Sequence, residues 1–489
     1  MDARRPGPLG LALAAALAFP AALAAQDRSC ELVTAARLEK IAAGTLSFYF
    51  FSGPVEFRCD GGVVVRADSA VGTQGVAGGQ GNTLELVGAV FYGDPLKTLT
   101  ADWVTYWGRE GRVHARGRVV LSDRASRSVV RGAELTYERQ RPGRPESRTV
   151  VPPGPTRPHA TLFPRRTARP APADTAAQPF EVDADWMEIL GQRAFRASGR
   201  VEIVRGATRA WANWAEYDQT HERLVLNGQA RIQSDSLELR GEAVEARLEG
   251  DRLREVVARV AAHLTGRDLR VEAPELRLFF EEDRLHRLVA RAAPGAWAAP
   301  GPGAAQARAT ARDLLLVADS IDALAPGQRL ERAAAVGRAY AERAPDPLRA
   351  GLPDPASRDW LRGDTILAHF TERKATPPAA RPTTADGPAP ATDTTRADPM
   401  LERLVAIGPE GRARALYRVP RRKGEGTRAA PSVTYTVADR ITLQLRNGEV
   451  QEAEAQGRIR GIHLEPASAR TAPRPAPRPP AGAGPDPER

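Results

Sequence analysis

Apolar and polar residues alternate with period two in short runs along most of the chain, as in Val201-Glu202-Ile203 and Leu237-Glu238-Leu239. Such alternation places the apolar side chains on one face of a β-strand and the polar side chains on the other. Turn-forming residues separate the runs, for example at Gly191-Gln192 and Glu282-Asp283. The pattern predicts a ladder of β-strands with one dry face.

Two short motifs recur along these runs. The first is a small residue followed by Asp and two alternating apolar positions, as in Ala101–Tyr106, Ala184–Ile189 and, with Asn at the acidic position, Ala212–Tyr217. The second begins with Gly, as in Gly117–Leu121 and Gly199–Ile203, and Ala258 and Ala290 take the place of the glycine in two middle units.

The motifs alternate at regular spacing. Asp185 to Gly199 and Gly199 to Asn213 are 14 residues each, so each motif recurs about every 28 to 32 residues. About 14 residues fit one strand of seven to ten residues and a turn. The predicted fold class is all-β, with repeated antiparallel strands and Pro-rich insertions.

Pro-rich stretches divide the repeats, because they contain too few apolar residues to build a core. The expected parts are a signal peptide at 1–25, repeats at 26–141, a Pro/Arg-rich linker at 142–178, central repeats at 179–293, further repeats at 304–374, a disordered linker at 375–398, C-terminal repeats at 399–465 and a disordered tail at 466–489.

The N-terminus has the pattern of a secretory signal peptide. Arg4 and Arg5 precede the uncharged apolar stretch Leu9–Leu23, and Ala22-Leu23-Ala24 supplies small residues for cleavage. Export would make a disulfide between Cys30 and Cys59 possible, with two unpaired thiols as the alternative.

The chain carries a net charge of +10, and nearly all of its basic residues are arginines. An anionic partner is one interpretation. The other is a genome that encodes arginine freely, which the interspersed acidic residues favour. We expect no nucleic-acid partner.

Motifs for enzymatic chemistry are missing. The seven histidines are scattered, without the close pair that a metal site needs, so we expect no metal, no cofactor and no catalysis. The recurring aspartates are expected to cap turns or begin strands rather than bind calcium, because each unit offers a single carboxylate. They are Asp68, Asp102, Asp185, Asp319, Asp364 and Asp439.

Trp103, Trp186 and Trp214 follow the acidic position in three units, on the face opposite the apolar set. They are expected either to clamp a lipid or sugar or to pack under a neighbouring loop.

The two alternating motifs resemble the OstA-like family, which includes the LptA-type lipopolysaccharide-transport proteins. The resemblance covers Val55–Tyr137 and Phe180–Ala292, is fragmentary over Arg308–Phe370 and returns at Val433–Leu464. It implies an elongated open β-jellyroll in the periplasm, with an apolar groove for acyl chains. Association with the outer membrane is a further expectation from the resemblance.

The resemblance also implies partners. These are lipopolysaccharide or another glycolipid, other OstA-like proteins joined by strand pairing at sheet edges, and, as a further candidate, an outer-membrane assembly protein. By alternation, the groove candidates are Val104, Tyr106, Val119, Leu121, Met187, Ile189, Val201, Ile203, Tyr217, Ile232, Val244, Leu248 and Leu278. The pattern itself fits a packed core between sheets equally well, so a structural or adhesive surface solenoid with a closed interior is the alternative.

Overall fold

The computed structural model describes residues 30–75, 83–163, 178–234, 236–249, 252–293, 306–343, 358–372, 399–419, 432–446 and 448–465. The expected signal peptide, the expected linker 375–398 and the expected tail from 466 lie outside the described residues. The chain forms two compact units: the first runs to Ala125 and resumes over Arg131–Arg148, and the second contains Ser126–Val130 and the chain from Thr149 onward.

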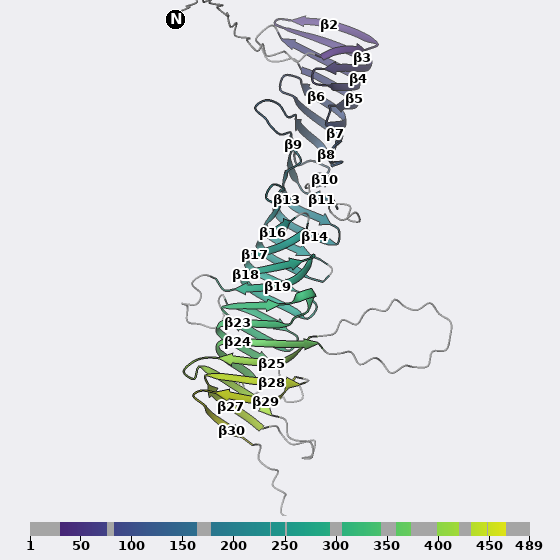
Figure 1. Cartoon of the computed structure of the whole chain (residues 1–489). Helices are drawn as coiled ribbons and strands as arrows, with labels where there is room; N and C mark the ends of the chain where they lie inside the picture. The colour runs from purple at the N-terminus through teal and green to yellow at the C-terminus, as the bar shows by residue number, and fades with distance from the viewer. Residues whose placement is uncertain are drawn as a thin grey trace, which may run out of the picture. The chain divides into compact units, whose positions relative to one another are not determined.

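The first unit is built from the strands at the purple and blue end of the colour bar (Figure 1). They are β1 (Cys30–Thr34), β2 (Arg37–Ala43), β3 (Leu46–Cys59), β4 (Val63–Gly75), β5 (Thr83–Gly93), β6 (Lys97–Trp107), β7 (Arg112–Asp123) and, from Arg131 on, β8 (Val129–Glu138).

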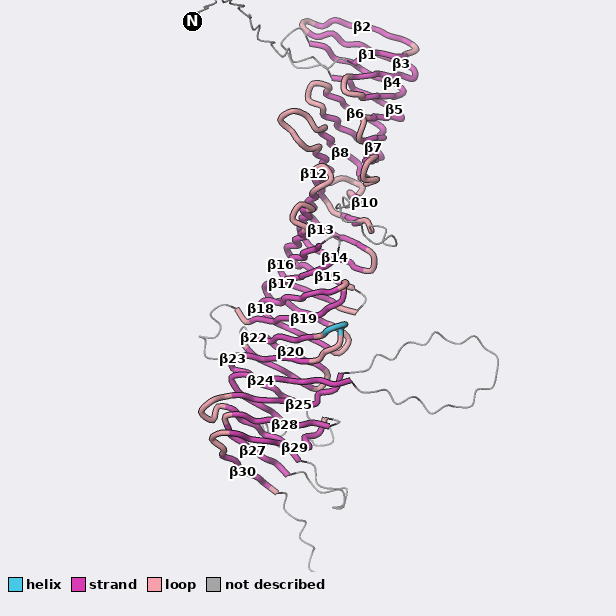
Figure 2. Tube along the Cα trace, in the orientation of Figure 1, coloured by secondary structure: helices cyan, strands magenta, loops and turns pink. Residues whose placement is uncertain are grey.

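The second unit is built from the same kind of ladder (Figure 2). Its strands are β9 (Arg148–Val151), β10 (His159–Leu162), β11 (Phe180–Asp183), β12 (Trp186–Leu190), β13 (Ala194–Arg205), β14 (Thr208–Asp218), β15 (Arg223–Gln233), β16 (Glu238–Glu249), β17 (Arg252–Thr265), β18 (Leu269–Glu281), β19 (Arg284–Arg291), β20 (Ala307–Ala311), β21 (Leu314–Ala318), β22 (Ser320–Leu324), β23 (Arg332–Arg343), β24 (Trp360–Glu372), β25 (Pro399–Ile407), β26 (Ala413–Val419), β27 (Ser432–Ala438), β28 (Arg440–Arg446), β29 (Glu449–Gln456) and β30 (Arg460–Leu464).

The all-β prediction is confirmed: strand pairs are antiparallel, and a single helical turn, η2 (Pro326–Gln328), stands among them in the described ranges. The strands between predicted turns are longer than seven to ten residues, as with the 12 residues of β13 and the 14 of β17. No helix in the described part of the chain is long and apolar enough to cross a bilayer.

The extra length has one cause: most long strands are bent in the middle. In β13 the pairing with β14 is interrupted between Ser198 and Val201, and in β14 the pairing with β15 is interrupted between Trp211 and Trp214. Each half pairs with a half of the next strand, so the bends line up. We call the row of bends the bend edge and the strand ends farthest from it the rim.

The halves on either side of the bend edge form two walls. In the second unit, wall A contains β12, β19, β22, β25, β28 and β29, and wall B contains β11, β20, β21, β26, β27 and β30; β13–β18, β23 and β24 contribute one half to each. Apolar side chains of both walls are buried between them, from Val182 and Phe195 to Ile441. This is an open β-jellyroll.

The structure settles the pairing of the two cysteines and differs from the expected linker at 142–178. The N-terminal described residues form β1 and β2, and a disulfide joins Cys30 to Cys59 across the β1–β3 pair. The expected linker 142–178 contributes β9 and β10, because Thr149, Val151 and Ala160 are buried in the second unit.

Candidate lipid groove

The recurring Asp and Gly motifs meet at the bend edge. Gly199 has φ +76° and Arg200 has φ +48°, so these two residues leave the ladder and bend the strand. The Arg200 Nη2 atom lies 2.6 Å from Asp185 Oδ1. A Cβ atom on Gly199 would lie 2.8 Å from the Asp185 Cβ atom, so only glycine fits beside this aspartate.

The same arrangement, which we call the bend clip, recurs in both units. Arg118 Nη2 lies 2.6 Å from Asp102 Oδ1 beside Gly117, and Arg338 Nη2 lies 2.6 Å from Asp319 Oδ1 beside Gly337. Asp102 stands within β6 and Asp319 between two short strands, both at a bend. Asp185 and Asp319 directly precede β12 and β22, in line with the expected strand-entry role, whereas Asp102 stands inside β6.

The arginines of the bend clip stabilise the ionised form of the aspartates. Hydrogen bonds from Arg118 and Arg200 hold the pKa values of the Asp102 and Asp185 carboxyls below their usual range. Each carboxylate is thus satisfied by an arginine of the same chain. Within the described ranges, no group of three or more His, Cys, Asp or Glu is placed to hold a metal ion.

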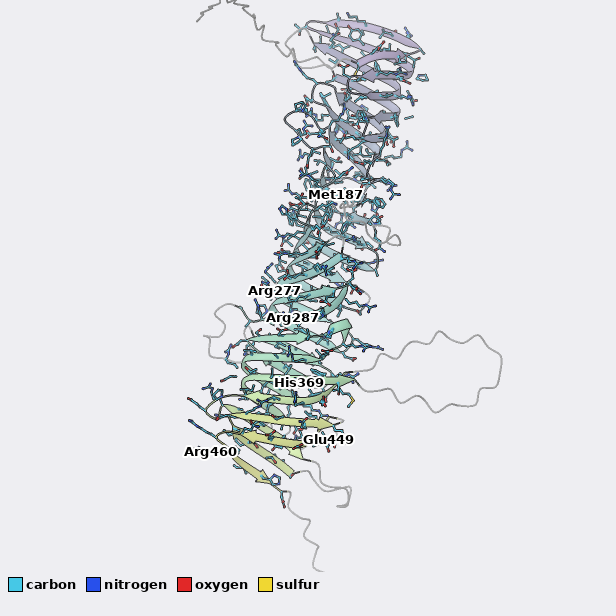
Figure 3. All side chains as sticks on the ribbon, viewed as in Figure 1. Met187, Arg277, Arg287, His369, Glu449 and Arg460 are labelled. Atoms are coloured by element: carbon cyan, nitrogen blue, oxygen red, sulfur yellow. A yellow bond between two sulfur atoms is a disulfide. The ribbon has the colours of Figure 1, made fainter. Side chains whose placement is uncertain are left out.

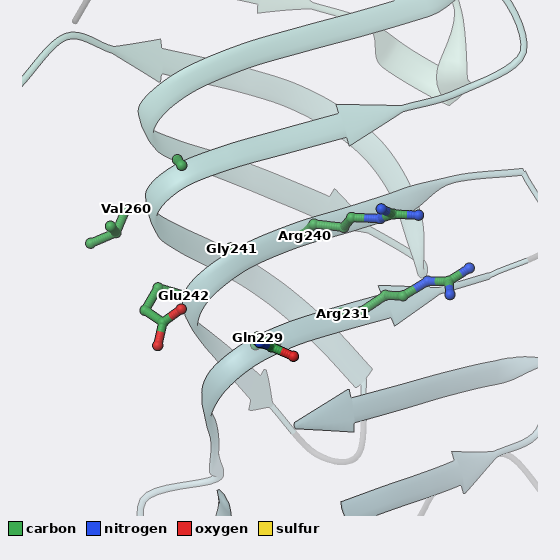
Figure 4. Close-up of a pocket in the computed structure, with 8 residues that line it drawn as sticks. Gln229, Arg231, Arg240, Gly241, Glu242 and Val260 are labelled. Carbon is green, nitrogen blue, oxygen red and sulfur yellow. The ribbon is translucent and has the colours of Figure 1, made fainter. Parts of the chain in front are cut away.

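The clip is replaced in the middle of the second unit. Asn213 stands beside Gly228, and in β17 the bend falls at Val260 and Ala261, with φ values of +63° and +50°. Ala258, expected in the glycine's place, is instead a buried strand residue two positions earlier. Gln229, Glu242 and the 63% exposed Val260 surround a shallow depression of about 400 Å³ here (Figure 4).

Most of the groove candidates lie buried between the walls. Those with at most 8% exposure are Val104, Tyr106, Val119, Leu121, Met187 (labelled in Figure 3), Ile189, Val201, Ile203, Tyr217, Val244 and Leu278. Ile232 and Leu248 are half-exposed. These two residues lie near the rim on opposite walls, Ile232 on wall B and Leu248 on wall A.

The interior is filled by the side chains of the protein itself. Val104, Ala197 and Leu276 are 0% exposed, so no water-sized space adjoins them.

In the first unit, a buried polar network closes the rim. Asp94, 3% exposed, lies in the turn after β5, and its Oδ2 atom accepts hydrogen bonds from the Tyr92 and Tyr137 hydroxyls at 3.1 and 3.0 Å. Its Oδ1 atom accepts the backbone N–H groups of Leu96 and Lys97. The pKa values of both tyrosines are raised, first by burial and then by the Asp94 charge.

This Asp94 network joins the two walls of the first unit. Asp94 lies between residues 90–93 of β5 and 97–101 of β6, which belong to one wall. Tyr137 lies beside residues 112–116 of β7, which belong to the other wall, where Thr136 contacts His114. Arg139 Nε lies 3.4 Å from Asp94 Oδ2, and its Nη2 donates to the Gly61 carbonyl. Alternation did not reveal this network; the Asp94-Pro95 turn signal is its only trace in the sequence.

In the second unit, aromatic rings close the rim. Phe180 of wall B lies with its ring centroid 5.1 Å from that of Tyr217 and 6.3 Å from that of Phe195, both of wall A. All three residues are at most 6% exposed. The walls meet here through ring contacts rather than through a buried carboxylate, and the Arg205 guanidinium lies 4.7 Å from the Phe180 ring centroid.

The outer faces of the walls are polar in most places. On wall A, Glu245 pairs with Arg223 and Arg259, and Arg277 (labelled in Figure 3) pairs with Glu275. The three tryptophans after the acidic positions are half-exposed on this side. Trp103 packs edge-on against His114 at 6.0 Å and lies under Arg116.

Comparison with known proteins adds little to this geometry. No family model matches the sequence, and a search of curated proteins finds no match. Among solved structures, the chain is similar to LptH of Pseudomonas aeruginosa, described as the LptA-homologous periplasmic component of the lipopolysaccharide transport device. The match is 18% identical, covers 34% of this chain and 82% of that one, and has a TM-score of 0.17. Such a low score supports no inference about function, so the jellyroll assignment rests on the strand pairing described above.

Proposed function

We propose that the protein is an exported, non-catalytic carrier that shields the acyl chains of lipopolysaccharide or a related glycolipid between its two walls, in the periplasm. The observation that carries the proposal is the apolar rim of the second unit. There the walls meet through Phe180, Phe195 and Tyr217, and Ile232 and Leu248 are half-exposed apolar residues on opposite walls.

Acyl chains can replace contacts of this kind at little cost. An acyl methylene that leaves water gains about 0.8 kcal/mol, and it can pack against aromatic and aliphatic side chains in place of the opposite wall. At the rim of the first unit, a chain would have to leave the Asp94 carboxylate buried without its donors, which is costly. We therefore assign acyl-chain entry to the second unit.

The terminal strands support partners of similar fold. β2 pairs with β3, and β30 pairs with β27, and every residue of β2 and β30 is exposed. Leu38 and Ile41 are 52% and 54% exposed on β2. Open edges of this kind accept a further strand, so we propose that other jellyroll transport proteins, or an outer-membrane assembly protein, add to these edges.

A second candidate function follows from the packed interior. A structural or adhesive solenoid needs no lumen, and the 0% exposure of Val104 and Leu276 fits one. The two functions differ in whether the walls separate around a lipid.

Photo-crosslinking separates the two candidates. A benzophenone amino acid at Tyr217 or Ile203, which point inward, is expected to crosslink to lipid in the native envelope, and mass spectrometry of the adduct identifies the lipid. The matched controls are Glu216 and Glu202, the preceding residues, whose side chains point outward. Carriage is refuted if inward and outward positions give the same adducts, or if the inward positions give none while the protein is folded.

A further inference from the structure

The outer face of wall B changes character along the second unit. One row of outward side chains crosses neighbouring strands in register, and its members on β13–β20 are Val204, Arg209, Gln233, Glu238, Thr265, Arg270 and Thr310. The same row continues on β21–β30 as Leu315, Glu342, Trp360, Leu416, Tyr435 and Ile462. A polar row thus becomes an aromatic and aliphatic one.

The apolar part of this row is not covered by other described elements. Ile462 of the row and Leu464, two residues further along β30, are each 61% exposed, and Trp360, Leu416 and Tyr435 are half-exposed. The Trp360 and Tyr435 rings lie 6.2 Å apart. Contiguous apolar surface outside a core marks an interaction site.

The neighbouring row toward the bend edge is basic. Its members on the same strands are Val317, Tyr340, Arg362, Arg414, Val437 and Arg460. The three arginines are exposed, and Arg460 is labelled in Figure 3. The Arg362 guanidinium lies 5.1 Å from the Tyr340 ring centroid and 5.3 Å from that of Trp360.

These arginines have no carboxylate partner in the described part of the chain. The nearby acids are engaged elsewhere: Glu342 pairs with Arg358, and Asp359 pairs with the buried Arg418 at 2.8 Å. On the polar part of wall B, by contrast, Arg231 and Arg240 both pair with Glu238. Uncompensated positive charge therefore coincides with exposed apolar surface.

We propose that this face, which we call the docking face, binds the surface of a bilayer that contains anionic lipids. Trp and Tyr side chains settle at the level of the lipid headgroups, and Ile462 and Leu464 can reach the acyl boundary. Arginines beside them meet the headgroup phosphates while their apolar stems stay on the protein surface.

Charge favours an anionic lipid surface over a second copy of this chain, or one of its own neighbouring segments, as the partner of the docking face. A second copy would bring its own Arg362, Arg414 and Arg460 against the same row, and like charges would repel. The segments that adjoin the face in sequence, 420–431 and 466–489, also carry more basic than acidic residues. An anionic surface is the complementary partner.

Vesicle flotation of the full chain tests the proposal. The protein is expected to float with vesicles of phosphatidylcholine and phosphatidylglycerol in equal parts and not with phosphatidylcholine alone, and added salt should release it. The double variant Arg414→Glu, Arg460→Glu should weaken binding at least about tenfold. The matched control, Arg270→Glu with Arg308→Glu, reverses two exposed arginines on the polar part of the same wall and should float like the parent protein.

A fluorescent label locates the contact. An environment-sensitive dye on Ile462→Cys should brighten when anionic vesicles are added, whereas the same dye on Thr265→Cys, in the polar part of the same row, should not. Equal flotation with neutral vesicles, equal binding by the two double variants, or equal brightening at both positions would overturn the proposal. So would brightening at position 462 with envelope proteins but not with vesicles, because the face would then be a protein interface.

Discussion

Each unit has a bend edge built in the same way, and the two units differ at the rim. In both, an aspartate, a glycine and an arginine build the bend clip, as Asp102–Gly117–Arg118 and Asp185–Gly199–Arg200. At the rim, the first unit buries a carboxylate that is held by directional hydrogen bonds, and the second unit stacks aromatic rings. The bend edge is therefore built in the same way in both units, and the units differ in the contacts at the rim.

The difference has a physical meaning for opening. Directional bonds to Asp94 specify one closed arrangement, and separating the walls there strands a charge. Ring contacts between Phe180 and Tyr217 have no such requirement, and other apolar groups can satisfy them. On the proposed function, the first unit resists separation of its walls and the second exchanges wall contacts for a ligand.

Removing the carboxylate of the first rim should have the largest effect. Asp94→Ala leaves the Tyr92 and Tyr137 hydroxyls and the Arg139 guanidinium without their acceptor, at an expected cost of about 3–5 kcal/mol. Hydrogen exchange followed by mass spectrometry measures the opening free energy in peptides of the first unit. Peptides of β20–β30 serve as the internal control, and equal destabilisation of both units would contradict a local network.

Adding a methyl group at the bend should cost less, and should cost the same in both units. Gly199→Ala and Gly117→Ala place a Cβ against Asp185 and Asp102 at positive φ, so each should lose about 2 kcal/mol. Gly327→Ala is the control: φ is +60°, but a Cβ there meets nothing within 4 Å, so only about 1 kcal/mol should be lost. Denaturant unfolding measures all three, and an effect confined to one unit would show that the clips are not equivalent.

Weakening the second rim should cost still less stability while favouring opening. Phe180→Leu removes two ring contacts worth about 1 kcal/mol and keeps the site apolar. Binding of an environment-sensitive apolar dye should increase. Tyr49→Leu, the loss of an aromatic ring within β3 of the first unit, provides the comparison, and an unchanged dye signal in Phe180→Leu would argue against entry at the rim of the second unit.

The smallest effect concerns the pH dependence of the clips. Because the folded-state pKa of Asp102 lies below the ordinary value of 3.8, its contribution is present above that value and is lost as the pH falls through the lowered pKa. Asp102→Asn should therefore be destabilising at neutral pH and equal to the parent protein in strong acid. Thermal unfolding across that range measures the difference, with Asp185→Asn as the counterpart in the second unit. A difference that persists in strong acid would show that the carboxylate charge is not what the clip uses.

Much of the interior could be read from alternation. Val104, Val201 and Ile203 were expected to face inward, and all are at most 3% exposed. Alternation fails where the phase breaks: Ala212 and Ala215 are both buried although they are three residues apart, because Asn213 lies at a bend. The position of one bend was also misjudged, since β17 bends at Val260 rather than at Ala258.

The sequence by itself determined the repeat, the strands and the dry face, because the pleat of a strand fixes side-chain direction locally and leaves a period of two in the chain. It also marked most bends, since positive φ selects glycine there. Only the tertiary structure decided how each rim closes and where the outer face turns apolar. Those features join residues far apart in the chain, such as Asp94 and Tyr137, 43 positions apart, and Trp360 and Ile462, which share a row through strand register. Neither a closing contact nor a row across strands leaves a local pattern to be read.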